Sequence, residues 1–474
     1  MTQGRATVVL DIGKTLSKLS LWRSDGTLVE RVTRPNERVD AGPWRALDVH
    51  GITLWLGDAL RRFAGLADIG AIIPVAHGAA AAVVRDGRLC CPPFDYESPI
   101  PAAVRQAYDA LRDPFARTGS PALPDGLNLG AQLYWLGLLH EGLYASGTQI
   151  LTWPQYWSWC LSGVAASEVT SLGCHTDLWC PATAQPSQLA ERCGWSACLP
   201  PLRGAGEALG AITPDWAART GLRCDTRVHC GLHDSNAALV AARAFSEVAG
   251  REATVLSTGT WFIAMRTPGP GAAVDLQRLP EGRDCLVNVD VQGRPVPSAR
   301  FMGGREIEVL TGDPALRIDV EADHAALLAA IPPVLASGGR VLPTFAPGCG
   351  PYPDGAGHWN AMPADRAARR AATGLYAALV TDTALDLIGS CETLLIEGRF
   401  ARAQGFTRAL ASLRPGTRVF TALADNDVSY GALRLLDLDL PVPTALREVL
   451  PLDVDLRQYA QAWRDEAQRG IRTT

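Results

Sequence analysis

The chain has 474 residues, a formal net charge of −5 and a hydrophobic content of 47%. This length exceeds what one hydrophobic core usually serves, so we expect two or three domains, and the mild acidity argues against nucleic acid as a partner. No segment is apolar over the roughly 20 residues that cross a bilayer, and the N-terminus lacks the pattern of a signal peptide, so we expect a cytoplasmic protein with no membrane partner.

The first half of the chain alternates strand-like and helix-like segments. β-rich or apolar runs between turn residues, with alternating polarity at 14–22, predict strands at 6–13, 14–22, 27–34, 69–78, 79–87 and 148–153. Helical patterns occur at 43–63, 102–111, 129–144 and 155–161. The segment 226–234 predicts a strand that runs into a helix beginning at Asp234.

The second half opens with the same theme as the first. Residues 253–267 predict a strand, a tight glycine turn and a second strand, so Gly259 takes the place that Gly13 has near the N-terminus. This weak internal repeat predicts two similar α/β halves, 1–245 and 246–474. Further on we expect a Pro/Gly-rich ordered loop at 343–359, helices at 367–390 and 429–436, strands at 393–400 and 418–423, and a peripheral helix from about 452.

Lysine is almost absent from the chain. Of 44 basic residues other than histidine, only Lys14 and Lys18 are lysine. A genome that favours arginine codons explains the scarcity, yet both lysines lie in one turn-and-strand segment. A compact ammonium suits phosphate oxygens in places where the wide guanidinium does not fit. Lys14, in the turn itself, is therefore a candidate phosphate contact.

The 12 cysteines contain no C-x-x-C pair. A loose group lies near His175, at Cys174, Cys180, Cys193 and Cys198. Its spacing matches no common zinc-ligand pattern. We interpret these side chains as reduced thiols, which are normal in a cytosolic chain.

The turn from Asp11 to Thr15 is the first candidate site. A carboxylate that ends a buried strand is costly unless it is paired or bound to a metal. Gly13 lets backbone N–H groups approach an anion, and Lys14 and Thr15 add a positive charge and a hydroxyl. The segment can hold a metal and a terminal phosphate, or it can be an ordinary hairpin turn.

The second candidate turn is its uncharged counterpart in the second half. Thr258, Gly259 and Thr260 offer hydroxyls and exposed N–H groups, which form an anion-binding nest. A plain hairpin turn is again the alternative. The symmetry of the two turns favours a pair that clamps phosphate groups.

Asp234 lies where a strand gives way to a helix, at the edge where open α/β sheets bind ligands. Aspartate is favoured as a helix N-cap, and such a cap is compatible with catalysis. Phosphoryl transfer needs positioning, charge neutralisation and a group that accepts the hydroxyl proton. His233 beside it can contact a sugar or pack in the core.

Several polar and aromatic side chains follow buried strands of the first half and suit a sugar. They are His77, Gly78, Asp95, Tyr96 and Gln155, with Trp153, Tyr156 and Trp157 near the last of them. Sugars are bound by such mixtures, although most of the 13 tryptophans are expected to pack in cores.

The order of these segments over nearly the whole chain resembles the FGGY carbohydrate kinases. DIGKT resembles their first phosphate turn, VAHGAAAAVVRDG their sugar-side strand, and LTWPQYWSWCLSG their LLPxYLxYxLTG stretch. GLHDSNAALVAA, STGTW, VNVDVQGRP and EGRFARAQGF resemble its remaining motifs, the last being its adenosine motif. The His-Asp pair is most similar to the rhamnulokinase and fuculokinase branches.

The resemblance implies two RNase H-like domains of the actin-like ATPase superfamily. Residues 1–245 would bind the sugar and carry the base, and residues 246–474 would bind ATP. It makes Asp234 the general base and Asp11 the Mg²⁺ ligand, and it places Asn288 near the sugar. The ATP contacts are implied at Gly13, Lys14, Thr15, Thr258, Gly259, Thr260, Gly398 and Arg399.

The implied activity is ATP-dependent phosphorylation of a small ketose, a ketopentose or a 6-deoxyketohexose such as L-rhamnulose or L-fuculose. A polyol kinase and a nucleotide-gated regulatory protein of the same superfamily stay as alternatives, and the second would not need Asp234. A dehydrogenase is disfavoured because no G-x-G-x-x-G follows the first strand. The sequence leaves the oligomeric state open, a homodimer included.

Overall fold

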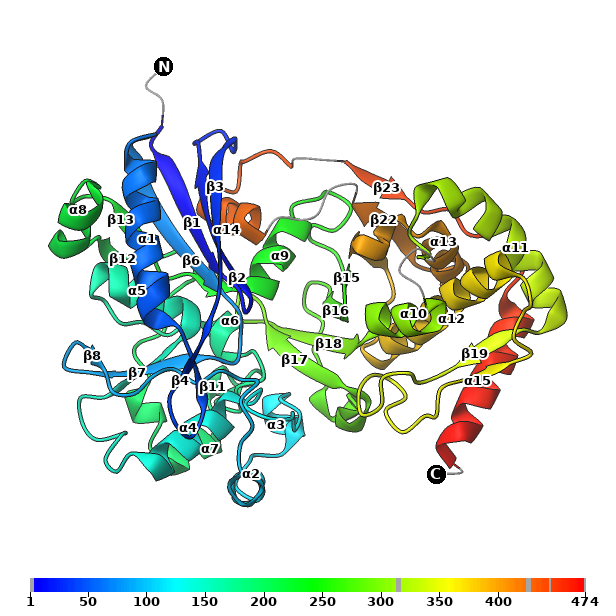
Figure 1. Cartoon of the computed structure of the whole chain (residues 1–474), viewed down its shortest axis with the longest axis horizontal. Coiled ribbons are helices and arrows are strands. Elements are labelled where there is room, and N and C mark those ends of the chain that lie inside the picture. Colours follow the sequence, from blue (N-terminus) through cyan, green and yellow to red (C-terminus); the bar gives the residue numbers. More distant parts are fainter. Residues whose placement is uncertain (1–3, 313–316, 423–427, 443–444, 473–474) are drawn as a thin grey trace. The chain divides into compact units, whose positions relative to one another are not determined.

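The computed structural model describes residues 4–312, 317–422, 428–442 and 445–472 (Figure 1). The chain divides into two compact units. The first consists of Met1–Ala241, Val287–Pro295 and Asp427–Pro441, and the second of Ala242–Leu286, Val296–Asn426 and Val442–Thr474. The main change of unit lies close to the expected one at 245/246, but two later segments join the first unit rather than the second.

The first unit is built on a mixed sheet with the order β12-β13-β6-β1-β2-β3, in which β14 also pairs with β6. Strand β1 runs antiparallel to β2 and parallel to β6, as in RNase H-like domains. This confirms the meander predicted for residues 6–34. The strands are β1 (Ala6–Ile12), β2 (Leu16–Trp22), β3 (Leu28–Pro35), β6 (Ile69–Ala76), β12 (Ala208–Ala211), β13 (Arg227–His229) and β14 (Leu232–His233).

Alternation along β1 gives this sheet a core on each face. Val8, Leu10 and Ile12 pack toward α1 (Val49–Ala64), α5 (Trp153–Ser162) and α8 (Pro214–Thr220). Val9 points to the opposite face, toward α9 (Asp234–Ala242) and α14 (Val428–Leu436). Figure 1 shows the two groups of helices on either side of the sheet. Each fully buried aliphatic side chain contributes roughly 1.5–3 kcal/mol.

The helix predicted from residue 43 begins only at Val49. Asp48 caps it, because its carboxylate accepts a hydrogen bond from the backbone N–H of Gly51 at 2.8 Å. The residues before the cap form a small hairpin instead, in which β4 (Arg38–Asp40) pairs with β5 (Arg45–Leu47).

A second core in the first unit lies around β7 and the helices that follow it. Its largest members are Trp44, Phe94, Trp135 and Trp195. The strands are β7 (Ala81–Arg85), β8 (Arg88–Leu89), β9 (Gln149–Thr152), β10 (Trp179–Cys180) and β11 (Gln185–Pro186). The helices in this part of the unit, not all of which contribute to that core, are α2 (Ala102–Asp109), α3 (Phe115–Thr118), α4 (Leu129–Leu139), α6 (Val169–Leu172) and α7 (Gln188–Arg192).

The second unit repeats the plan of the first. Its sheet has the order β17-β18-β16-β15-β21-β22-β23, and β15 runs antiparallel to β16 and parallel to β21. This agrees with the internal repeat seen in the sequence. The strands are β15 (Ala253–Thr258), β16 (Phe262–Thr267), β17 (Cys285–Val289), β18 (Pro295–Phe301), β21 (Thr393–Gly398), β22 (Arg418–Ala422) and β23 (Leu446–Glu448).

Five helices accompany this sheet in the described residues. They are α10 (Gly303–Thr311), α11 (His324–Ser337), α12 (Arg366–Leu387), α13 (Gln404–Leu413) and α15 (Arg457–Arg472). A two-stranded ribbon of β19 (Arg340–Leu342) and β20 (His358–Asn360) brackets the predicted Pro/Gly-rich loop. Within the part of the chain that the structure covers, no helix is both long and apolar enough to span a bilayer.

Helices α9 and α14 approach so closely in the first unit that only glycine fits at position 431. A Cβ there would lie 1.9 Å from the carbonyl oxygen of Ala237. We predict that Gly431→Ala destabilises the protein by about 1–3 kcal/mol and lowers Tm by several degrees, because α14 must move off α9. Gly405→Ala is the control, since a Cβ at Gly405 meets nothing within 4 Å. Equal Tm values for the two variants would contradict the close approach.

Candidate active site

Three parallel strands of the first unit end at one edge of the sheet. Ile12 of β1 is paired with Ala76 of β6, and His233 of β14 is paired with the same Ala76. The segments that follow these strands carry most of the candidate residues from the first half. Because carboxyl ends of parallel strands form the ligand-binding edge of such sheets, we take this edge as the candidate active site.

The first turn is tight and carries a paired carboxylate. Asp11 is 5% exposed, and the ammonium of Lys18 lies 3.0 Å from its Oδ2. The Gly13 N–H donates to the carbonyl of Leu16 at 3.1 Å, and a Cβ at Gly13 would lie 2.9 Å from that oxygen. Thr15 is exposed at the tip. The turn therefore requires glycine for steric reasons, and phosphate binding by this turn stays a prediction.

The ammonium of Lys14 lies beside residues that are candidates for sugar binding. Its ammonium forms an ion pair with the fully buried Asp95 and lies 4.3 Å from the centre of the Tyr96 ring. Arg38 also contacts Asp95, with 3.1 Å between Nε and Oδ2. Burial lowers the pKa of Lys14 to about 8. Lys14 thus lies among the candidate sugar residues, and its contact with phosphate stays a prediction.

His77 and Gly78 follow β6 at the same edge. The imidazole of His77 packs edge-on against Tyr96 and near Trp153, with ring centres 5.5 and 6.5 Å apart. Burial lowers the pKa of His77, so the ring is neutral near pH 7. Its Nδ1 lies 2.7 Å from the Gly78 carbonyl and must donate to it. Nε2 is then the nitrogen that can accept a hydrogen bond.

Gln155 has a supporting position rather than the sugar contact expected for it. The side chain is fully buried at the start of α5. Its amide donates to the carbonyls of Cys230 and Gly231 at 3.1 and 3.0 Å, and its oxygen accepts from Thr152. Since both amide hydrogens are used on the main chain, Gln155 fixes the segment that leads into β14.

Asp234 begins α9, and one of its oxygens accepts two hydrogen bonds from Ser235. Oδ1 accepts from the Ser235 N–H at 2.6 Å and the Ser235 hydroxyl at 3.3 Å, and His233 Nε2 lies 3.2 Å away. In the part of the chain that the structure describes, no hydrogen bond reaches Oδ2. The side chain is 31% exposed. Burial raises the pKa of Asp234, and the Ser235 hydrogen bonds and the nearby His77 and Lys18 oppose that shift.

Sequence reasoning missed the residues behind His233. Cys174 Sγ lies 3.3 Å from His233 Nε2, and the Thr170 hydroxyl accepts from the His233 backbone N–H at 3.1 Å. Glu168 in turn accepts from the backbone and hydroxyl groups of Thr170 and Ser171. The sequence holds one signal for this cap, since an acidic residue two and three positions before Thr and Ser suits a helix start.

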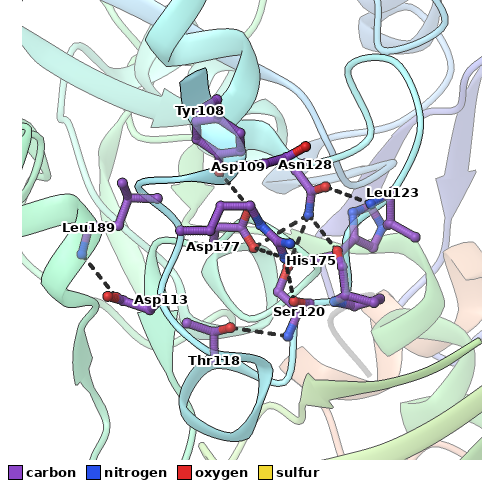
Figure 2. A network of polar contacts seen from close by, with 12 residues as sticks. Tyr108, Asp109, Asp113, Thr118, Ser120, Leu123, Asn128, His175, Asp177 and Leu189 are labelled. Atoms are coloured by element: carbon purple, nitrogen blue, oxygen red, sulfur yellow. Dashed lines mark hydrogen bonds and ion pairs between the residues drawn. The ribbon is translucent and has the colours of Figure 1, made fainter. Parts of the chain in front are cut away.

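A buried polar network supports the loop that carries Cys174 (Figure 2). At its centre, Asp177 accepts from the Tyr108 hydroxyl and from Arg112 Nε and Nη2 at 3.0 and 3.1 Å. Burial and the Asp177 charge raise the pKa of Tyr108 well above its usual range. Asn128 ties the same carboxylate to the segment 120–123. The network fixes two loops that border the site.

Asn288 belongs to the first unit although it lies in the second half of the sequence. The Val287 N–H donates to the Gly119 carbonyl at 2.8 Å, and a Cβ at Gly173 would lie 2.4 Å from the Val289 side chain. The buried Asn288 lies between these two contacting residues in the chain. Its backbone is therefore held against the segment at Gly119 and against Gly173, which directly precedes Cys174. The structure brings it into the unit that carries Asp234.

The turn at Gly259 in the second unit is joined to the segment at Gly398. The Thr258 hydroxyl donates to the Glu397 carbonyl at 2.5 Å and accepts from the Phe400 N–H at 3.0 Å. Gly398 has a φ of +81°, and a Cβ there would lie 2.5 Å from the Thr258 carbonyl. The hydroxyl of Thr258 is therefore used inside the protein, whereas Thr260 is exposed.

Arg399 and the start of α10 complete the surroundings of this turn. Arg399 forms ion pairs with Glu308 and Asp319, each at 3.2 Å. A Cβ at Gly304, in the first turn of α10, would lie 2.0 Å from the Gly259 carbonyl. Sequence reasoning missed the Gly303–Gly304 pair, which lets a helix N-terminus approach the turn. Such a terminus favours anions.

The chain is similar to known carbohydrate kinases in sequence and in fold. The family description "Carbohydrate kinase FGGY, C-terminal domain" matches residues 250–444. A solved carbohydrate kinase from Novosphingobium aromaticivorans is 54% identical, with 98% of this chain and 99% of that chain covered and a TM-score of 0.95. The search of curated proteins gives no match.

Two more distant solved structures share the fold. A ligand-bound xylulose kinase from Lactobacillus acidophilus is 13% identical, with 99% and 97% of the two chains covered and a TM-score of 0.75. A Plasmodium falciparum glycerol kinase with ADP is 12% identical, with 98% of each chain covered and a TM-score of 0.78. The fold is that of two RNase H-like domains, as the resemblance implied. The chain belongs to the FGGY carbohydrate kinases, and it is a phosphotransferase.

The backbone at Gly78 leaves no room for a side chain beside His233. A Cβ there would lie 2.6 Å from Cys174 Sγ and 3.1 Å from His233 Nε2. We predict that Gly78→Ala lowers kcat/KM for sugar-dependent ADP release roughly 10- to 100-fold, because it displaces both side chains.

The double variant Gly78→Ala/Cys174→Ala is the control for this effect. It removes the sulfur atom nearest the new methyl group, so it should recover a large part of the lost kcat/KM. Parental kcat/KM in Gly78→Ala would show that the glycine is not required at this site.

Proposed function

We propose that the protein transfers the γ-phosphoryl group of ATP to a hydroxyl of a small ketose, a ketopentose or a 6-deoxyketohexose. The observation that carries the proposal is the arrangement at Asp234. One carboxylate oxygen is held by donors, and the other receives no hydrogen bond from the described residues. Such a group can accept the proton of a sugar hydroxyl as that hydroxyl attacks phosphorus.

The role of Asp234 follows from its orientation and charge. Donors at Oδ1 fix the plane of the carboxylate and direct Oδ2 outward as the proton acceptor. Burial brings the pKa of Asp234 closer to the working pH, which improves a general base. The proton passes from the sugar hydroxyl to Oδ2 while the new O–P bond forms and the bond to the ADP leaving group breaks.

Sugar binding is proposed for the residues gathered at the same edge. Asp95, Tyr96 and the acceptor nitrogen of His77 supply an anion, a phenol and an imidazole, and Gly78 follows His77 in the chain. Asn288 adds an amide from a distant part of the sequence. The Lys14–Asp95 ion pair gives this group fixed charges. Hydroxyl-rich ligands suit such paired donors and acceptors, and apolar ligands do not.

Nucleotide binding is proposed for the turns at Gly13 and Gly259 and for the segment at Gly398. In the first turn, Thr15 is exposed. In the second, the exposed Thr260 and the nearby N-terminus of α10 favour phosphate oxygens. Arg399 would contact the nucleotide only at the expense of its ion pairs with Glu308 and Asp319.

The residues around Asp11 fit a Mg²⁺ ion that is bound mainly by ATP and water. Among the described residues there is no cluster of three or more His, Cys, Asp or Glu side chains that could hold a metal. Asp11 is a single carboxylate, already balanced by Lys18. Mg²⁺ keeps several waters and commonly uses one or two carboxylates with phosphates. When bound, the ion would neutralise phosphate charge, and Asp11 would fix its position.

Replacement of Asp234 tests the proposed base. We predict that Asp234→Asn lowers kcat roughly 10²- to 10⁴-fold, because the amide cannot accept the proton, while the Kd for ADP stays unchanged. The assay is ADP release with MgATP over a panel of ketopentoses, 6-deoxyketohexoses and polyols. The proposal is supported if a ketose gives the highest kcat/KM of the panel. If a polyol gives the highest value, the proposed substrate class is wrong and the protein is a polyol kinase. Turnover of Asp234→Asn at the parental rate would show that Asp234 is not the general base.

The pH profile tests the charges around Asp234. Its pKa is raised by burial and lowered by Lys18. Because only the ionised carboxylate accepts a proton, activity should fall as pH drops through this raised pKa, above the usual range near 3.9. We predict that Lys18→Gln moves the acid limb of kcat/KM to higher pH, since a stabilising positive charge is lost. Arg88→Gln, an exposed charge on β8, is the matched control. An unmoved limb in Lys18→Gln would contradict the assignment.

A further inference from the structure

The side chain of Lys14, in the turn that follows β1, belongs to a group of balanced charges. Its ammonium donates a hydrogen bond to Oδ1 of Asp95, whose side chain is fully buried. Oε2 of Glu97 lies 3.8 Å from the same nitrogen, and the centre of the Tyr96 ring lies 4.3 Å away. Arg38 contacts both carboxylates. Two positive and two negative side chains therefore balance one another here.

This arrangement is unfavourable for a phosphate group at Lys14. Phosphate oxygens would approach two carboxylates as they neared the ammonium, because Asp95 and Glu97 flank it. If the ammonium moved out to meet a phosphate, the buried Asp95 would keep only Arg38 and the Glu97 backbone N–H, the latter at 3.0 Å. A buried charge that loses a partner is costly. The ion pair therefore holds Lys14 back from the ATP phosphates.

The same ammonium is close to the residues around Asp234. The Tyr96 ring packs edge-on against His77, with 5.5 Å between ring centres. Burial is the main cause that lowers the pKa of His77, and the positive charge of Lys14 adds to it. Burial and the charges of Glu97 and Asp234 raise the pKa of Tyr96 to about 12. Because such effects weaken with distance, Lys14 shares its surroundings with the proposed base.

The ammonium of Lys14 has donors that the protein does not use. A lysine ammonium carries three N–H groups. Within the described ranges of the chain, its only hydrogen bond goes to Asp95. The side chain is 12% exposed, so a ligand can reach part of it. An ammonium that is held by a carboxylate against an aromatic ring has a fixed place, and it can donate to one ligand oxygen at that place.

We propose that Lys14 is a specificity-determining residue for the sugar: Asp95 holds its ammonium against Tyr96, and the ammonium donates to one sugar hydroxyl other than the one that is phosphorylated. The family resemblance implied an ATP contact for this residue instead. The inference rests on the proposed phosphorylation of a sugar and deepens it. Because the charges around Lys14 are balanced and Asp234 is an anion, the substrate is a neutral sugar rather than a sugar acid.

Replacement of Lys14 separates a sugar contact from a phosphate contact. Lys14→Met keeps an unbranched side chain and removes the ammonium. The full-length enzyme is assayed by ADP release with MgATP and the panel sugar of highest kcat/KM. We expect the KM for the sugar to rise roughly 10- to 100-fold, while the KM for ATP and the Kd for MgADP stay within about twofold of the parental values. A rise confined to the ATP and MgADP constants would overturn the proposal.

Monodeoxy sugars identify the hydroxyl that Lys14 contacts. Each hydroxyl of the preferred sugar is removed in turn, except the one that is phosphorylated. For one analogue the parental kcat/KM should fall roughly 10- to 100-fold, whereas Lys14→Met should use that analogue and the complete sugar about equally well. Losses that are the same in both enzymes for every analogue would overturn the contact. A higher kcat/KM for an aldonate than for any neutral sugar would overturn the charge argument.

Asp95 tests whether the ion pair holds the ammonium in place. Asp95→Asn should raise the KM for the sugar and leave the KM for ATP unchanged. If Asp95 acts through Lys14, the double variant Lys14→Met/Asp95→Asn should lose no more than Lys14→Met alone. Multiplied losses would overturn the holding role. Arg88→Gln, an exposed charge on β8, is the control and should leave both KM values unchanged.

The double variant also serves if Lys14→Met does not fold, as judged by circular dichroism, because it removes the charge that Lys14→Met leaves in the core. Failure of the proposed function gives a different result. If no panel sugar releases ADP, or if Asp234→Asn turns over at the parental rate, the proposed reaction is wrong. If a sugar is phosphorylated and Asp234→Asn is inactive, but removal of the ammonium keeps the parental KM for the sugar, only the role of Lys14 is wrong.

Discussion

The carboxylate of Asp234 carries a charge at the end of a buried strand, and its hydrogen bonds at Oδ1 are what hold that charge in one orientation. A buried carboxylate without donors would take up a proton or rotate, and neither state serves as a base. Ser235 supplies two donors from the start of α9, and the ring of His233 lies 3.2 Å from the same oxygen. Other contacts in the first unit hold the segments that carry these groups in place.

That support is built in layers. Gln155 ties the carbonyls of Cys230 and Gly231 to α5, and Thr170 ties the next strand to α6. The Asp177 network fixes the loop that brings Cys174 against His233. Buried polar networks of this kind are costly when incomplete and rigid when every group is bonded.

Sequence patterns predicted the parts that depend on local order. The turns at Gly13 and Gly259 and the strand-to-helix junction at Asp234 are short segments whose residue types suffice to suggest their geometry. The same reasoning did not foresee the partners of Gln155 and Lys14, because the direction of a side chain is set by packing partners that lie far along the chain. Lys14 meets Asp95, and Gln155 meets Cys230. Likewise nothing local shows that residues 287–295 and 427–441 belong with the first unit.

The most direct test of Asp234 as the base uses an acceptor that needs less help. Fluorine on the carbon beside the acceptor hydroxyl makes that hydroxyl more acidic, so its attack depends less on a base. The ratio of kcat/KM between the parental enzyme and Asp234→Asn should be measured for the natural sugar and for its deoxyfluoro analogue. The account predicts a clearly smaller ratio for the analogue. The same ratio for both sugars would contradict proton transfer to Asp234.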